Sequence, residues 1–148
     1  MNYEALKLDN QLCFALYACS REITKLYKPV LDTLGITYTQ YISLLVLWER
    51  DNITIKDLGL KLHLDSGTLT PLLKKLESMG LITRTRDTVD ERKVYVTLTH
   101  KGIELKNVAV EIPNTILCST GLTHENAQLL KENITSLLLS LAPGDNSK

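Results

Sequence analysis

Cysteines are the residues of this chain that could do covalent chemistry on their own, and there are three: Cys13, Cys19 and Cys118. A thiolate attacks peroxide oxygen or disulfide sulfur, and several thiolates together can hold a metal ion. No two of these cysteines stand at the C-x-x-C spacing, and an odd number fits neither a zinc site nor a secreted disulfide framework. Any disulfide in this chain is therefore expected to be regulatory.

The residues around Cys13 leave its role open. It lies on the apolar face of a predicted N-terminal helix, where a cysteine is often a small buried hydrophobic side chain, but a reactive thiol would fit there too. Cys19 lies six residues further along, which rotates it by roughly 120° around a helix of about 3.6 residues per turn. We therefore expect Cys19 to be structural.

Small polar residues followed by lysines open a predicted helix in the middle of the chain. They are Asp65, Ser66, Gly67, Thr68, Thr70, Lys74 and Lys75. Hydroxyl and backbone N–H groups at a helix start can approach phosphates and base edges closely, and lysines one turn later add positive charge. Because Ser and Thr discriminate bases weakly, specificity would depend partly on DNA shape. Taken alone, the small residues could equally be an ordinary helix cap.

A charged hairpin is predicted after this helix. Residues 81–86 and 93–98 alternate with period two and are rich in β-branched side chains, and the polar segment 87–92 between them is longer than a tight turn needs. The charged residues that we expect to contact DNA from this hairpin are Arg84, Arg86, Asp90 and Arg92. Asp90 could hold an arginine in an extended pose, so that Arg92 could enter a narrow minor groove.

The charges of the chain are unevenly distributed although they sum to zero. Residues 1–73 hold seven Lys or Arg and eight Asp or Glu, residues 74–101 seven and four, and residues 102–148 three and five. DNA binding needs local rather than global positive charge, and the excess falls within residues 74–101, which include the end of the predicted helix and the hairpin. A solvated charge cluster would have the same composition.

Composition predicts one ordinary domain of a cytoplasmic protein. With 148 residues, of which 44% are hydrophobic and 23% charged, the chain can bury a single core and has no sign of disorder. The N-terminal stretch has no basic segment followed by an apolar run, so we expect no signal peptide and no membrane partner. No phosphate-binding glycine loop, metal-ligand spacing or Ser/His/Asp set is present, so we expect no cofactor and no metal.

Periodicity and capping signals predict a mainly helical chain. A long amphipathic helix is expected over residues 6–34, with a bend near Pro29. The elements expected after it are helices over 37–50, 55–62 and 66–79 with N-caps at Thr37, Thr54 and Asp65 and a kink at Pro71, then the hairpin, a helix from Thr99 to about Leu117 kinked at Pro113, and a last helix capped by Thr123 before a frayed end over 142–148.

These elements predict a winged helix-turn-helix, mainly α with a small β-hairpin wing. Two short helices joined by a tight turn and followed by a charged hairpin can place the second helix in a major groove and the hairpin tip near a minor groove. The first helix and the last two are more apolar than so short a chain can cover, which favours a homodimer. An intramolecular three-helix bundle is the alternative.

A resemblance to a known family rests on three motifs, which are Leu64–Glu77 (LDSGTLTPLLKKLE), Asp90–Arg92 (DER) and Val96–Thr99 (VTLT) with Gly102. In these motifs the chain is similar to the MarR family of winged-helix regulators. With this resemblance we expect one domain over 1–148, with a DNA-binding part at 36–99 and dimerisation helices at 1–35 and 100–148. The resemblance implies an intertwined homodimer that binds a pseudo-palindromic operator on double-stranded DNA, with its recognition helices in successive major grooves.

Within that family the run Leu12–Tyr17 (LCFALY), together with Tyr27 and Tyr38, resembles the organic hydroperoxide resistance regulators. The resemblance implies that Cys13 is the peroxide-reactive thiol and that the two tyrosines donate hydrogen bonds to it. Oxidation to a sulfenic acid would disturb the packing at a dimer seam and release the operator. In the two-cysteine branch a cysteine placed like Cys118 resolves the sulfenic acid as an intersubunit disulfide. An inert Cys118 is the alternative.

Two other functions are compatible with the residues. A MarR-like repressor could respond instead to a small aromatic acid held between the dimer helices and the DNA-binding part. A thiol peroxidase could use Cys13, but His63, His100 and His124 lie in or beside predicted turns and caps, where surface histidines are usual, so no second base is evident. We therefore expect a transcription repressor rather than an enzyme.

Overall fold

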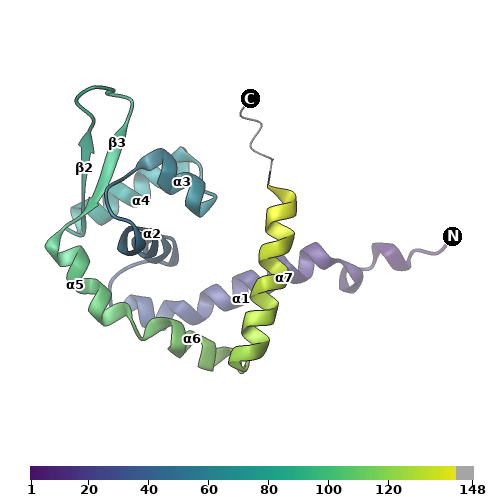
Figure 1. Ribbon diagram of the computed structural model, residues 1–148. Helices are drawn as coiled ribbons and strands as arrows, with labels where there is room; N and C mark the ends of the chain where they lie inside the picture. The colour runs from purple at the N-terminus through teal and green to yellow at the C-terminus, as the bar shows by residue number, and fades with distance from the viewer. Residues whose placement is uncertain (143–148) are drawn as a thin grey trace. The chain divides into compact units, whose positions relative to one another are not determined.

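The computed structural model describes residues 1–142, and the chain divides into two compact units, residues 1–111 and 112–148. The first unit contains the 3-10 turns Glu4–Leu6 and Leu8–Asn10, the helices α1 (Leu12–Asp32), α2 (Tyr38–Glu49), α3 (Ile55–Leu62), α4 (Ser66–Ser78) and α5 (His100–Ala109), and the strands β1 (Ile53–Thr54), β2 (Ile82–Arg86) and β3 (Val94–Leu98) (Figure 1). The second unit contains α6 (Ile112–Thr120) and α7 (His124–Leu141). The predicted mainly helical architecture with a hairpin is confirmed.

The first helix begins later than predicted. Two separate 3-10 turns stand where a continuous helix from residue 6 was expected, and α1 starts at Leu12. Two side-chain amides explain the difference, because Asn10 Nδ2 donates to the Glu4 carbonyl at 2.7 Å and Gln11 Nε2 donates to the Ala5 carbonyl at 2.6 Å. Local bonds of this kind compete with helix formation.

Helices α2, α3 and α4 begin at the predicted caps. Thr37 and Gln40 form a complete capping box, and the side chains of Thr54 and Asp65 each accept a backbone N–H of the following turn. Gly80, with a φ of 72°, follows α4 as the predicted stop. The kinks predicted at Pro29 and Pro71, which lie inside α1 and α4, stay predictions.

Fully buried aliphatic side chains from α2, α3, α4 and the strands form the core of the first unit. They are Leu44, Leu47, Leu58, Leu69, Leu73, Leu76, Ile82 and Val96. This core fixes α4 against α2, α3 and β2, so the helix-turn-helix and the base of the hairpin are one packed body.

The hairpin is part of a three-stranded sheet rather than the two-stranded ribbon that we predicted. Strand β3 pairs antiparallel with β2 over all five residues of each strand and with β1 on its other side, in the order β1-β3-β2. Strand β1 has only two residues, so no alternation of apolar and polar side chains could reveal it in the sequence.

The single helix predicted from Thr99 to about Leu117 is wrong, because α5 ends at Ala109 and a separate α6 begins at Ile112. Pro113 explains the break. A proline there cannot donate to the carbonyl four residues earlier, and its ring crowds that carbonyl, whereas the first turn of a new helix tolerates it.

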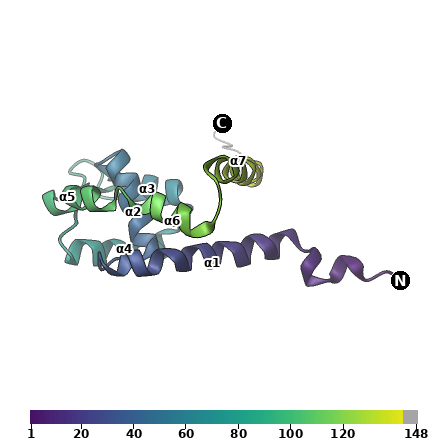
Figure 2. The ribbon, with the colours of Figure 1, turned by 90° about the horizontal axis from the view of Figure 1, so that it is seen from below.

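The N-terminal part of α1 has little cover within its own unit. Leu12, Phe14 and Tyr17 expose 66%, 40% and 59% of their surfaces. In both views this part of α1, with the 3-10 turns before it, extends away from the helix-turn-helix and the sheet (Figures 1 and 2). Much of the apolar surface of these side chains is therefore left uncovered by the first unit.

The second unit begins its last helix where the sequence predicts. The Thr123 side chain accepts from the Asn126 N–H and caps α7. Much of the predicted apolar stripe is exposed along this helix, at Leu129, Leu130, Ile134, Leu138 and Leu141. The fraying predicted over 142–148 lies beyond the described residues, apart from Ala142.

Candidate DNA interface and redox site

Helix α4 buries one face and exposes the other. The buried face is made of Leu69, Leu72, Leu73 and Leu76. The exposed residues include Ser66, Gly67, Thr68, Lys74 and Lys75. Thr70 is half-buried, and its Oγ1 donates to the Ser66 carbonyl at 2.8 Å. The structure thus places most of the residues predicted to contact DNA along the outer face of a single, firmly packed helix.

Asp65 caps the start of α4. Its Oδ1 accepts from the backbone N–H of Thr68 at 2.7 Å. Hydrogen bonds from Thr68, and more weakly from the backbone of Gly67, hold the pKa of the Asp65 carboxyl below its usual range. The carboxylate thereby fixes the first turn, in which Ser66 and Gly67 present their backbone N–H groups.

The wing tip is ordered by two aspartates. Asp90 Oδ1 accepts from the backbone N–H and from Nε of Arg92, at 3.2 and 3.1 Å, and the Arg92 side chain is 92% exposed. The predicted pairing of Asp90 with an arginine is present. Asp87 Oδ1 accepts from the N–H groups of Val89 and Asp90, which hold the pKa of Asp87 low. Asp87 was missed, although an aspartate that opens a turn is a known signal for this motif.

Arg84 joins the wing to α4. Its Nε and Nη2 donate to Glu77 Oε2 at 3.1 and 2.7 Å, its backbone N–H donates to Oε1 at 3.1 Å, and its side chain is only 22% exposed. The guanidinium holds the pKa of Glu77 below its usual range. Arg84, which we expected to contact DNA, thus has its guanidinium engaged inside the protein, whereas Arg86 at the end of β2 is exposed.

Tyr27 and Tyr38 lie together, with a third tyrosine beside them. The Tyr27 ring centroid is 4.8 Å from that of Tyr38 and 5.8 Å from that of Tyr41. Burial, and then the neighbouring phenols, raise the pKa of Tyr27 to about 12, and burial raises the pKa of the other two. Tyr41 is buried in α2, and no local pattern in the sequence marks it as a neighbour of Tyr27. Within residues 1–142 the hydroxyl groups of Tyr27 and Tyr38 have no hydrogen-bond partner.

All three cysteines are free and exposed. Cys13 is the second residue of α1, and Tyr27 follows fourteen residues later in the same helix. At a rise of about 1.5 Å per residue the two lie about 21 Å apart, so the phenols and the thiol of one chain cannot meet. Cys19, expected to be structural, is exposed as well, and Cys118 lies in α6 of the second unit.

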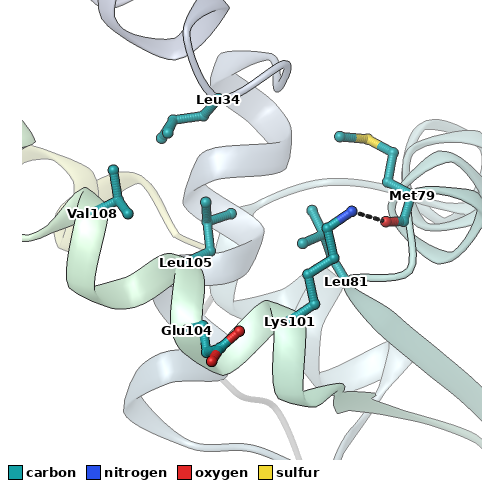
Figure 3. A pocket seen from close by; sticks show the side chains of 7 residues that line it. All are labelled: Leu34, Met79, Leu81, Lys101, Glu104, Leu105 and Val108. Carbon is teal, nitrogen blue, oxygen red and sulfur yellow. Dashed lines mark hydrogen bonds between the residues drawn. The ribbon is translucent and has the colours of Figure 1, made fainter.

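A pocket of about 270 Å³ lies where the ends of α1 and α4 meet α5 (Figure 3). Its walls are mostly aliphatic, with Met79 at the end of α4 and the side chains of Lys101 and Glu104 from α5. No helix among residues 1–142 is long and apolar enough to cross a membrane, and no group of three or more potential ligands there is placed to hold a metal ion.

The chain matches known regulators over most of its length. A profile of the family described as transcriptional regulator SarA/Rot matches residues 25–108, more than half of the chain. The chain is also similar to the organic hydroperoxide resistance transcriptional regulator of Bacillus subtilis. The two are 53% identical over 139 residues, which cover 94% of this chain and 95% of that protein.

Solved structures of AbfR, a protein of Staphylococcus epidermidis, are similar in fold and sequence. Reduced AbfR bound to DNA matches with a TM-score of 0.77 and 38% identity over 95% of this chain and 99% of that one. Overoxidised AbfR bound to DNA matches with a TM-score of 0.76 and 38% identity over 95% and 100%. Disulfide-formed AbfR matches with a TM-score of 0.63 and 37% identity over 91% and 95%.

These matches extend over the helix-turn-helix, the wing and the helices on either side. The winged-helix fold that the sequence predicts is thereby confirmed. The chain belongs to the SarA/Rot family of transcriptional regulators, within the MarR-type winged-helix proteins and in the branch of the organic hydroperoxide resistance regulator.

Proposed function

We propose that this chain is a homodimeric, cytoplasmic transcription repressor that leaves its operator when Cys13 is oxidised by an organic hydroperoxide. One observation carries the redox part of this proposal. The exposed thiol of Cys13 lies at the start of α1, whereas Tyr27 lies near the other end of that helix, with Tyr38 of α2 beside it. Two copies of α1 that cross antiparallel would place the thiol of each beside the phenols of the other.

The DNA-binding part extends over residues 36–99. The outer face of α4 reads a major groove, and the wing inserts Arg92 into the neighbouring minor groove, with Asp90 holding the guanidinium in place. The relative AbfR is bound to DNA in two of its structures, which supports this assignment. A two-fold dimer presents two such DNA-binding parts related by symmetry, so its operator is pseudo-palindromic.

Residues 1–35 and 100–148 supply the dimerisation helices. Apolar side chains of α1 and α7 are exposed in the single chain, Leu12 at 66% and Leu129 at 57% among them. Uncovered apolar surface of this kind is typical of a protein interface. The dimer seam would therefore include the start of α1, where Cys13 lies.

The reaction at Cys13 is a two-electron transfer of oxygen. The thiolate attacks one peroxide oxygen, the O–O bond breaks, and an alcohol leaves with a proton while the sulfur becomes a sulfenic acid. Phenol hydroxyl groups of the partner chain, free of other hydrogen bonds within residues 1–142, would donate to the sulfur and stabilise its thiolate form. The thiol of Cys118 then attacks the sulfenic sulfur, a disulfide forms and water leaves.

The disulfide, rather than an oxidised Cys13 alone, is the form that releases DNA in this proposal. Overoxidised AbfR is still bound to DNA, and AbfR also exists in a disulfide form. Linking Cys13 to Cys118 of the other chain would change the packing of the dimerisation helices. This change would move the two DNA-binding parts apart.

The central experiment measures binding to a labelled duplex of the DNA directly upstream of the gene for this chain, with and without cumene hydroperoxide. Wild type is expected to bind when reduced and to lose at least about tenfold in affinity when oxidised, which corresponds to roughly 1.4 kcal/mol. Cys13→Ser should bind equally with and without the oxidant, and Cys19→Ser, a matched cysteine control on the same helix, should respond like wild type. Release by Cys13→Ser would contradict the proposal.

The same samples test the role of Cys118 by non-reducing electrophoresis. Oxidised wild type should migrate as a covalent dimer that dithiothreitol reverses. Cys118→Ser should migrate as the single chain and should keep its operator affinity after oxidation. A covalent dimer in Cys118→Ser would exclude resolution by this residue.

A second candidate, release by a small aromatic acid, is favoured by the pocket of about 270 Å³ beside α5. A binding experiment with salicylate distinguishes the ligand-responsive repressor from the oxidation-responsive one. If it lowers the operator affinity of Cys13→Ser while the hydroperoxide leaves wild type bound, the ligand-responsive repressor is the correct one.

A further inference from the structure

The start of α5 holds the end of α4 through three successive carbonyl groups. Lys101 Nζ donates to the Met79 carbonyl at 2.9 Å and Thr99 Oγ1 donates to the Gly80 carbonyl at 2.6 Å. The backbone N–H of Thr99 donates to the Leu81 carbonyl at 3.0 Å. We call these three hydrogen bonds, donated by two residues to three carbonyl groups, the carbonyl clasp.

The clasp belongs to a region in which α5 approaches its neighbours very closely. A Cβ at Gly102 would collide with the Leu81 carbonyl, so only glycine allows this approach. Trp48 Nε1 donates to the Gly102 carbonyl at 2.9 Å, which ties the same turn of α5 to α2. The first turn of α5 is therefore fixed to the helix-turn-helix body.

Apolar packing at this junction is incomplete, because the pocket of about 270 Å³ lies directly beside the clasp (Figure 3). The side chains of Leu34, Leu105 and Val108 line it without filling it. In Figure 3 the Lys101 side chain reaches the Met79 carbonyl. Since side chains that border a pocket lack part of their mutual attraction, the hydrogen bonds of the clasp add to the fixation of α4 on this side of the junction.

The clasp is also a short connection between two functional parts. Along the chain, Met79 and Lys101 are separated by β2, the wing tip and β3. The clasp joins these two residues directly. Helix α5 and the residue that follows it expose Ile103, Val108 and Val110 at 52%, 62% and 67%, an apolar surface suited to the dimer interface. One helix thus connects that surface to the end of the recognition helix.

We propose that Lys101 is a positioning residue for operator binding. Its ammonium on the Met79 carbonyl fixes the C-terminal end of α4 to α5, so that a shift of α5 at the dimer interface changes the pose of α4 on DNA. The cation also lies at the negative end of the α4 dipole, which favours the same placement. This inference rests on the proposed DNA-binding function, and it assigns to Lys101 no contact with DNA.

Lys106 supplies a matched control on the same helix. It too is an exposed lysine, and its Nζ donates to a carbonyl near the end of a helix, that of Trp48 in α2, at 3.3 Å. Lys101→Met and Lys106→Met each remove one charge and one such hydrogen bond and keep the apolar stem. Only the first of these bonds holds the recognition helix.

The experiment compares wild type, the two methionine variants and Lys101→Arg on the duplex from upstream of the gene for this chain, reduced and oxidised, over a series of salt concentrations. Lys101→Met should lose about five- to tenfold in reduced affinity, because it loses one hydrogen bond of a charged group whose strength solvent exposure reduces, and the ratio of reduced to oxidised affinity should shrink. Lys106→Met should stay within about twofold of wild type, and Lys101→Arg should restore binding. The slope of log affinity against log salt should not change, because no phosphate contact is lost.

Three results would overturn the inference: wild-type affinity in Lys101→Met, an equal loss in Lys106→Met, or a salt slope lowered by about one ion, which would mean direct phosphate contact. Failure of wild type to bind or to release the duplex would defeat the proposed function as well. A wild type that behaves as proposed beside an unaffected Lys101→Met would defeat this inference alone.

Discussion

At the scale of single residues, a contact could be predicted from the sequence only where its two groups lie close together in the chain. The caps at Thr54 and Asp65 were predicted because donor and acceptor lie within three residues of each other. The bond between Glu77 and Arg84 joins a helix to a strand across a turn, and no local pattern encodes it. Arg84 was therefore predicted as a DNA contact, although its guanidinium is engaged within the fold.

The Glu77–Arg84 pair makes the stability of the folded chain depend on pH. Arg84 lowers the pKa of Glu77 from its ordinary value of 4.5 in the folded state. The stabilisation is thus present above that ordinary value and is lost as pH falls through the lower folded value. Glu77→Gln should lower the free energy of unfolding by about 1 kcal/mol near neutral pH, a figure reduced for partial exposure.

Urea unfolding of Glu77→Gln and of wild type at neutral pH and near pH 3 tests this expectation, since the difference should shrink in acid. Glu91→Gln is the matched control, because Glu91 is exposed at the wing tip and forms no ion pair among the described residues. Equal stability of Glu77→Gln and wild type at neutral pH would show that the pair contributes nothing.

At the scale of elements, the helices of the DNA-binding part were predictable and the short or interrupted elements were not. Capping residues and the period of the leucines give α2, α3 and α4 almost to the residue. The two-residue β1 shows no period at all. The break between α5 and α6 was mistaken for a kink, because Pro113 fits the first turn of a new helix as well as a bent one.

The wing is the element whose proposed DNA contact is easiest to test by substitution. Arg92 is 92% exposed and takes no part in the core, so Arg92→Ala should leave the fold intact. Loss of its minor-groove contact should lower operator affinity at least about tenfold and reduce the salt slope by about one. Equilibrium binding at several salt concentrations measures both.

Lys28→Ala controls for the loss of a charge alone, because Lys28 is an exposed cation of α1 that pairs with Asp32. It should bind the operator like wild type. If Arg92→Ala also binds like wild type, the wing carries no contact.

At the scale of the whole molecule, the redox site cannot be assembled from one chain. The resemblance to hydroperoxide regulators named Cys13, Tyr27 and Tyr38 together, and the structure brings only the tyrosines together. No feature of a single sequence distinguishes residues that meet within a chain from residues that meet across a two-fold axis. The length of α1 makes that distinction, because a rigid helix keeps its two ends apart.

The uncovered apolar surface of α1 predicts a dimer at micromolar concentration. Sedimentation should give about twice the chain mass of 16.6 kDa. Phe14→Glu places a charge on that surface, where Phe14 is 40% exposed, and should shift the protein towards the monomer.

Val89→Glu is the matched control, since Val89 is 94% exposed at the wing tip and should not affect assembly. A wild type that sediments as a clean monomer would remove the dimer from the proposal. Equal sedimentation of Phe14→Glu and wild type would place the interface elsewhere.

The contact between Gly102 and the Leu81 carbonyl bears on how this chain can change over generations. Any side chain at position 102 would force α5 and the segment at Leu81 apart. Steric exclusion alone therefore selects for glycine at this position during evolution. The exposed positions of α5 are not restricted in this way. Substitutions there can change which chains pair with one another as dimers. Paralogues in one cell could thereby diverge in partner choice while every one of them keeps the same close contact between α5 and the start of the hairpin.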